Sequence, residues 1–154
     1  MNKRYISYDE YGKLVSKLIA VLEFSQSPTS LNPEGLKPFD FVYGIPRGGL
    51  PLAVELSHKM GIKFGGSDYR FDLNHIENYH KNILLVDDLV DSGQTMTDAI
   101  KNIFRGFVNI KTACLFFKPW AIYKPDYFVE QTIDWITFPY EDMEEVIPQK
   151  YLNR

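Results

Sequence analysis

The sequence predicts an α/β fold with a mainly parallel, twisted sheet flanked by helices. Residues 83–86 are continuously apolar, as in a strand that is buried on both faces of a helix-covered sheet. Residues 39–45 and 112–117 form two further strand-like runs, whereas residues 14–22 and 50–60 carry apolar side chains at helical spacing. Strands that alternate with helices in this way are typical of parallel sheets.

The first predicted element is an amphipathic helix within residues 1–24. Ser7 and Glu10 have the spacing of a capping box, in which each residue satisfies a backbone N–H group at the helix start. The apolar residues that follow share one helical face: Leu14, Val15, Leu18, Ile19 and Leu22. Residues 25–38 are rich in Ser, Pro, Asn and Gly and are predicted to form a loop that leads to the first strand.

A strand over residues 39–45 is predicted to end at Pro46-Arg47-Gly48-Gly49, before a helix over residues 50–60. An arginine in this position suits an anion, because its guanidinium can hold two phosphate oxygens at once. The glycines would let backbone amides approach the same group. The alternative is an ordinary strand-to-helix turn with a surface arginine.

The strand over residues 83–86 is expected to end at Asp87 and Asp88, at the carboxyl edge where open α/β sheets bind ligands. Residues 92–95 read Ser-Gly-Gln-Thr, and a helix is expected from about Thr97. Backbone amides in such a turn can converge on an anion, whereas carboxylates accept hydrogen bonds from sugar hydroxyls or hold a hard cation. The run therefore predicts a sugar-phosphate site with Mg²⁺ at its acidic end.

Other interpretations of the acidic pair are a solvated turn or the acidic pocket of a different α/β protein. A Walker-type nucleotide hydrolase requires Gly-x-x-x-x-Gly-Lys-(Ser/Thr), and a dinucleotide-binding fold requires Gly-x-Gly-x-x-Gly. The chain contains neither motif.

Residues 83–95 resemble the phosphoribosyl pyrophosphate motif of the type I phosphoribosyltransferases at every constrained position. The resemblance implies that family's fold, with a small hood region, and Mg²⁺ at Asp88. It also implies that phosphoribosyl pyrophosphate is bound by Arg47, Gly48, Gly49, Asp87, Asp88, Asp91, Ser92, Gly93, Gln94 and Thr95.

Two of these residues have implied catalytic roles. Arg47 would bind the leaving group in the pyrophosphate loop, a loop in which family members often hold a non-proline cis peptide that the Gly48-Gly49 pair would tolerate. Asp91 would be the general base that removes the imidazole-ring proton of a purine. The alternative for Asp91 is a carboxylate that caps the turn or the next helix.

The order of Lys118, Pro125-Asp126-Tyr127, Trp135-Ile136 and then an aromatic-acid pair resembles the xanthine-guanine branch of that family. Lys118 would contact the purine 6-oxo group, Trp135 would stack on the ring, and the Ile136 backbone would read the 2-position. A solvated strand end remains the alternative for Lys118, and a core position for Trp135. Trp120 and Tyr123 are alternative stacking groups.

The implied activity is transfer of the 5-phosphoribosyl group from phosphoribosyl pyrophosphate to guanine, xanthine or hypoxanthine in purine salvage. The products would be the nucleoside monophosphate and pyrophosphate. The preference among the three bases depends on fine placement that a sequence does not show. A regulator that senses phosphoribosyl pyrophosphate without turnover and a transferase for another nucleobase are the alternatives.

The 154 residues are expected to form one domain. By resemblance to the family, residues 65–81 would form a mobile loop that closes over the substrate. This loop is shorter here than in typical xanthine-guanine enzymes. Arg70 would help to neutralise pyrophosphate there, whereas His75 and His80 are expected to be solvated. Residues 118–154 would form the base-binding hood and a C-terminal tail, with the acidic run at 141–145 solvated.

The composition excludes several other classes of protein. A formal charge of −3 gives no electrostatic case for nucleic acid, and no apolar stretch approaches the length of a membrane span. A single cysteine and the absence of a signal-peptide pattern in residues 1–10 predict a cytoplasmic protein. By analogy with the family, a homo-oligomer, either a dimer or a tetramer, is expected.

Overall fold

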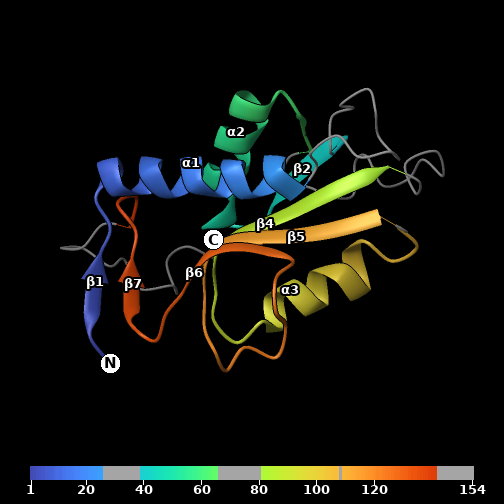
Figure 1. The fold of residues 1–154 in the computed structure, drawn as a ribbon. Helices are drawn as coiled ribbons and strands as arrows, with labels where there is room; N and C mark the ends of the chain where they lie inside the picture. Colours follow the sequence, from blue (N-terminus) through green and yellow to red (C-terminus); the bar gives the residue numbers. More distant parts are fainter. Residues whose placement is uncertain (26–38, 66–80, 108, 142–154) are drawn as a thin grey trace, which may run out of the picture.

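The computed structural model describes residues 1–25, 39–65, 81–107 and 109–141. A five-stranded sheet with the order β3-β2-β4-β5-β6 forms its centre (Figure 1). Every neighbouring pair in this sheet is parallel. The strands are β2 (Phe41–Gly44), β3 (Lys63–Phe64), β4 (Asn82–Val90), β5 (Asn109–Phe117) and β6 (Tyr127–Gln131). The predicted α/β fold with a parallel sheet is confirmed.

Helices cover both faces of the sheet. Helices α1 (Tyr8–Ser25) and α2 (Gly49–Met60) lie on one face, and α3 (Gln94–Asp98) lies on the other, continued by a π-helical segment, η2 (Ala99–Ile103) (Figure 1). Because side chains alternate along a strand, Leu84 and Val86 of β4 face the first layer, whereas their neighbours in the strand face the second. Both faces of β4 are therefore buried, as its continuous apolar run predicts.

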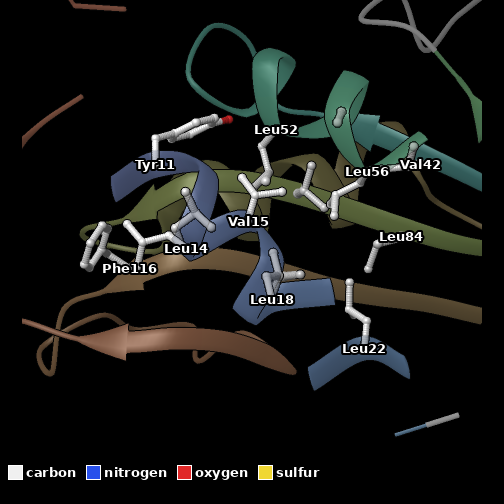
Figure 2. Packing of buried hydrophobic residues seen from close by; sticks show 14 of the residues in the cluster. Tyr11, Leu14, Val15, Leu18, Leu22, Val42, Leu52, Leu56, Leu84 and Phe116 are labelled. Atoms are coloured by element: carbon white, nitrogen blue, oxygen red, sulfur yellow. The ribbon is translucent and has the colours of Figure 1, made fainter. Parts of the chain in front are cut away.

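Helix α1 begins as the capping pattern predicts, because Ser7 Oγ accepts a hydrogen bond from the Glu10 amide at 3.1 Å. Four of the five predicted apolar residues are buried, and Ile19 is partly buried. Figure 2 shows the buried α1 side chains facing Leu52 and Leu56 of α2 and Leu84 of β4. This packing holds α2, and the loop that precedes it, against the sheet.

A second, two-stranded parallel sheet pairs β1 (Lys3–Tyr5) with β7 (Trp135–Thr137). The sequence did not predict β1, because three polar and aromatic residues carry no periodic signal and their partner strand is far along the chain. Arg4 anchors this small sheet by bonding Glu10 at 2.8 Å and Glu130 at 2.5 Å. The predicted helix of residues 1–24 is thus a short strand followed by a helix.

Two predicted boundaries near the acidic pair are wrong. Strand β4 continues past Asp87 to Val90, because β5 extends equally far and pairs Leu89 with Phe116 and Val90 with Phe117. Helix α3 begins at Gln94, not near Thr97. Pairing with a neighbouring strand has overridden the low strand propensity of the two acids.

The short strand β3 follows α2 and pairs in parallel with β2. Residues 66–80, which include Arg70, His75 and His80, lie outside the described residues, as do residues 142–145 of the acidic run. Among the helices that the structure describes, none has the length and apolar character required to span a membrane.

Candidate active site

The loop that follows β2 packs directly against β4. The Ile45 amide donates to the Val86 carbonyl at 2.9 Å, and α2 begins at Gly49. A Cβ atom on Gly49 would lie 2.4 Å from the Val86 oxygen, so this close approach requires glycine. Arg47 is exposed at the tip of the loop, where its guanidinium is accessible to an anion. The loop contains a cis peptide, at Pro46-Arg47 rather than at Gly48-Gly49.

Gly48 lies against the side chain of Asp88. A Cβ atom on Gly48 would be 2.2 to 2.4 Å from the three carboxylate atoms of Asp88. The predicted pyrophosphate loop is therefore in contact with the predicted acidic motif, although Gly48 and Asp88 are 40 positions apart in the sequence. This contact places a loop suited to phosphate beside a carboxylate suited to a sugar or a cation.

Asp87 and Asp88 form a close carboxylate pair with little access to water. Asp88 is 8% exposed and Asp87 is partly buried. The Asp88 amide donates to Asp87 Oδ1 at 3.0 Å, and the Leu89 amide donates to Asp88 Oδ1 at 2.7 Å. Burial raises the pKa of both carboxyls, and the neighbouring charge of Asp88 raises the pKa of Asp87 further. A cation bound at the pair would stabilise the ionised carboxylates and would therefore lower both pKa values.

The pair fits Mg²⁺ rather than a metal held entirely by protein. In the described ranges, no group of three or more His, Cys, Asp or Glu side chains is placed to hold a metal ion. Mg²⁺ commonly uses one or two carboxylates and takes its other ligands from water and substrate oxygens. The residues present are therefore compatible with a metal that arrives with a phosphorylated substrate.

The turn between β4 and α3 depends on Gly93. Its φ of 81° lies in the left-handed region, and a Cβ atom there would be 2.7 Å from the Tyr123 amide nitrogen. The Thr97 amide and Thr97 Oγ1 both bond to the Gly93 carbonyl, at 3.0 and 2.9 Å. Ser92, Gln94 and Thr95 remain exposed around this ordered turn, where they could contact a phosphate.

Asp91 is exposed, and its carboxylate is held by Trp120. The Trp120 indole nitrogen donates to Asp91 Oδ1 at 3.0 Å. The amide of Gln94, the first residue of α3, donates to Ser92 Oγ at 3.2 Å instead. The observed partner of Asp91 is thus a side chain of the loop after β5 rather than the start of helix α3, and the carboxylate stays accessible to a substrate.

Lys118 follows β5 in a buried position, so its interpretation as a solvated strand end is wrong. It is 2% exposed, and its ammonium donates to the Asp134 carbonyl. The same ammonium lies 5.5 Å from the centre of the Trp120 ring. The Lys118 ammonium is therefore close both to Trp120 and to Asp134, which precedes Trp135 in the chain.

Trp135 and Ile136 separate into an exposed and a buried position on β7. Trp135 is 58% exposed, so its interpretation as a core residue is wrong, whereas Ile136 is 5% exposed. Trp120 is also exposed, at 50%, and remains an alternative stacking surface.

The sequence did not predict a role for Tyr140 at this site. Its hydroxyl donates to Asp88 Oδ2 and lies 3.4 Å from the Gly48 carbonyl oxygen. Tyr140 is recognisable in the sequence as half of an aromatic-acid pair, but no spacing rule connects it with Asp88, 52 positions earlier. The other half, Glu141, is exposed and closes a turn by accepting a hydrogen bond from the Phe138 amide at 2.8 Å.

Comparisons with known proteins agree with this geometry. The family model described as "Phosphoribosyl transferase domain" matches residues 73–143. A crystal structure of a purine phosphoribosyltransferase from Pyrococcus horikoshii Ot3 has a TM-score of 0.72 and 28% identity, over 95% of this chain and 99% of that one. No curated protein sequence matches this chain significantly.

Two further structures have the same TM-score of 0.72 at lower identity and show the fold alone. The xanthine-guanine-hypoxanthine phosphoribosyltransferase of Helicobacter pylori is 23% identical over 99% of both chains. A hypothetical protein from Neisseria gonorrhoeae, solved with bound ppGpp, is 18% identical over 99% of this chain and 94% of that one.

Proposed function

We propose that this chain, a phosphoribosyltransferase by its motif, family model and fold, transfers the 5-phosphoribosyl group of phosphoribosyl pyrophosphate to a 6-oxopurine. Guanine, xanthine and hypoxanthine are the candidate acceptors. The proposal includes Mg²⁺ dependence, a role in purine salvage, a cytoplasmic location and assembly as a homo-oligomer.

The observation that carries the proposal is the contact between Gly48 and Asp88. Phosphoribosyl pyrophosphate carries a diphosphate and a diol on one small sugar, so a protein that binds it needs a phosphate loop and carboxylates side by side. Arg47 stands next to Gly48 with an exposed guanidinium that can hold two oxygens of the diphosphate. Asp87 and Asp88 can accept hydrogen bonds from the ribose hydroxyls.

The reaction would break the bond between the anomeric carbon and pyrophosphate and form a bond from that carbon to a purine nitrogen. Positive charge grows on the ribose while negative charge grows on the leaving group. Asp87 and Asp88 would stabilise the sugar, and Arg47 would stabilise pyrophosphate. Bound at Asp88, Mg²⁺ would supply further positive charge to the diphosphate.

Asp91 is the candidate general base for the purine ring proton. It is exposed, and one of its oxygens is fixed by Trp120 at 3.0 Å, which leaves the other oxygen for a substrate. A general base must lie within hydrogen-bond reach of the proton it removes. The imidazole ring of a purine held near Lys118 would face Asp91, because Trp120 contacts both Lys118 and Asp91.

The base would be held by Lys118, Trp135 and the Ile136 backbone. The Lys118 ammonium has three N–H donors and uses one on the Asp134 carbonyl, so others remain for a purine 6-oxo group. The exposed Trp135 ring offers a face for stacking. The printed names of the P. horikoshii and H. pylori proteins, both purine enzymes, support a purine as acceptor.

The proposal is tested by pyrophosphate release in the presence of Mg²⁺ and phosphoribosyl pyrophosphate, with guanine, xanthine, hypoxanthine, adenine, uracil and orotate in parallel. We expect release that requires both metal and a 6-oxopurine. Release with adenine, uracil or orotate, but with none of the 6-oxopurines, would instead identify a transferase for another nucleobase. Binding of phosphoribosyl pyrophosphate with no release for any base would identify a sensing protein.

A further inference from the structure

Tyr140 connects the segment after β7 with both halves of the substrate site. Its hydroxyl donates to Asp88 Oδ2 and lies 3.4 Å from the carbonyl oxygen of Gly48. A tyrosine hydroxyl has one proton, so the carboxylate is its acceptor and the Gly48 oxygen is a close neighbour. One side chain therefore spans the acidic motif and the pyrophosphate loop.

The Tyr140 ring is held in place by other aromatic rings. It stacks on Phe138 with centroids 5.4 Å apart and an interplanar angle of 2°. It also meets the edge of Tyr11 of α1 at 5.7 Å and 88°. Packing from two directions limits rotation of the ring, so the hydroxyl is aimed at Asp88 by the core and not by the hydrogen bond alone.

Together these contacts fix the orientation of the Asp88 carboxylate. Oδ1 accepts the Leu89 amide at 2.7 Å, Oδ2 accepts the Tyr140 hydroxyl, and Gly48 packs against the group. We propose that Tyr140 is a positioning residue that holds Asp88 and the pyrophosphate loop in the arrangement that Mg²⁺ and phosphoribosyl pyrophosphate require. The inference rests on the proposed function of this site.

The opposite role, in which the hydroxyl blocks Asp88 and must leave before substrate binds, is less consistent with the chemistry. An ionised carboxylate has about four lone-pair positions, so one donor on each oxygen leaves room for a cation and a sugar hydroxyl. Carboxylates that bind metals are usually oriented by hydrogen-bond donors of this kind, whose loss weakens metal affinity by about 10- to 100-fold. The two roles predict changes of opposite sign in affinity.

The test compares Tyr140→Phe with Tyr11→Phe in the full-length chain. Both variants remove one hydroxyl from the same aromatic cluster, but the Tyr11 hydroxyl is buried and has no hydrogen-bond partner among the residues that the structure describes. Calorimetric titration with phosphoribosyl pyrophosphate at several Mg²⁺ concentrations would measure affinity without turnover. Thermal unfolding of each variant would confirm that the fold is retained.

We expect Tyr140→Phe to weaken Mg²⁺-dependent binding of phosphoribosyl pyrophosphate by about 10-fold, and Tyr11→Phe to leave it unchanged. In steady-state assays the KM for phosphoribosyl pyrophosphate should rise, whereas the KM for the base should not. Unchanged or tighter binding in Tyr140→Phe would overturn the inference while leaving the proposed function intact. A wild-type chain that does not bind phosphoribosyl pyrophosphate would overturn both.

Discussion

The indole nitrogen of Trp120 donates a hydrogen bond to Oδ1 of Asp91 over 3.0 Å. The two side chains come from the loops that follow β5 and β4, and both are exposed. The Ile122 amide joins the same loops by donating to the Ser92 carbonyl at 2.8 Å. The candidate general base is thus oriented by a neighbouring loop at the carboxyl edge of the sheet, where substrates of open α/β folds bind.

Asp91→Asn is expected to lower kcat by at least about 100-fold, because general-base catalysis typically contributes this much or more. Binding of phosphoribosyl pyrophosphate should be nearly unchanged, since the amide keeps the size and the hydrogen-bond acceptor of the side chain. Steady-state kinetics and calorimetry would measure the two effects separately. Asp9→Asn, which changes an exposed acid that pairs with Lys13 on α1, is the control. Unchanged turnover in Asp91→Asn would remove this residue from the mechanism.

Trp120→Phe is expected to lower kcat by about 3- to 10-fold, the effect of a typical hydrogen bond of about 0.5–1.5 kcal/mol rather than of a stronger bond to a buried charged group, because this one is exposed to water. The substitution keeps an aromatic ring beside Lys118 and removes only the donor to Asp91. In the Asp91→Asn background, Trp120→Phe should have little further effect on kcat. Additive losses in the double variant would show that Trp120 acts independently of Asp91.

Trp135→Ala should raise the KM for the purine by roughly 5- to 150-fold, the equivalent of about 1–3 kcal/mol of stacking on an aromatic ring. The KM for phosphoribosyl pyrophosphate should change much less. Trp135→Phe should recover most of the loss, because it keeps a ring face. A large rise in base KM with Trp120→Ala but not with Trp135→Ala would assign the stacking role to Trp120 instead.

Gly48→Ala should abolish binding of phosphoribosyl pyrophosphate, because the added Cβ atom would overlap the Asp88 carboxylate at 2.2 Å. Gly12→Ala on α1 is a matched control, since a Cβ atom there would have no atom of the described residues within 4 Å. Alanine in a helix interior is favoured over glycine by roughly 0.5–1 kcal/mol, so this control should raise Tm slightly. Full binding by Gly48→Ala would show that the loop can move away from Asp88 at little cost.

The sequence predicts the local parts of the site and not the contacts that join them. Asp88 and Gly93 belong to a contiguous motif, in which strand, acids and turn follow one another. Their relative placement can therefore be predicted from the local sequence. Tyr140 reaches Asp88 across 52 positions and Trp120 reaches Asp91 across 29. Such contacts depend on how loops and strands pack in three dimensions.

The boundaries of the elements were misplaced for the same reason. Intrinsic propensity ends β4 at Asp87, but the ladder with β5 carries it to Val90. Strand β1 exists only because β7 lies beside it, with Arg4 opposite Ile136. The parallel sheet and its covering helices, in contrast, follow from long apolar patterns, which depend little on the partner.

Asp87→Asn is expected to stabilise the substrate-free protein near neutral pH while weakening its affinity for phosphoribosyl pyrophosphate. Burial, and then the charge of Asp88, raise the pKa of Asp87 above its usual value. A carboxyl with a raised pKa in the folded state binds its proton more tightly there than in the unfolded chain, so folding stability falls as pH rises from the unfolded pKa through the folded one.

An amide at position 87 removes this cost. The difference in Tm between variant and wild type should therefore be small in acid and grow as pH increases, until the wild-type carboxyl is fully ionised. Thermal unfolding at a series of pH values without Mg²⁺ would measure this difference, with Asp9→Asn as the exposed control. A difference that is independent of pH, or a variant less stable than wild type at neutral pH, would contradict a destabilising charge at Asp87. A carboxylate that lowers folding stability is expected to be kept beside Asp88 if it is needed for binding, because function and stability often conflict at such sites.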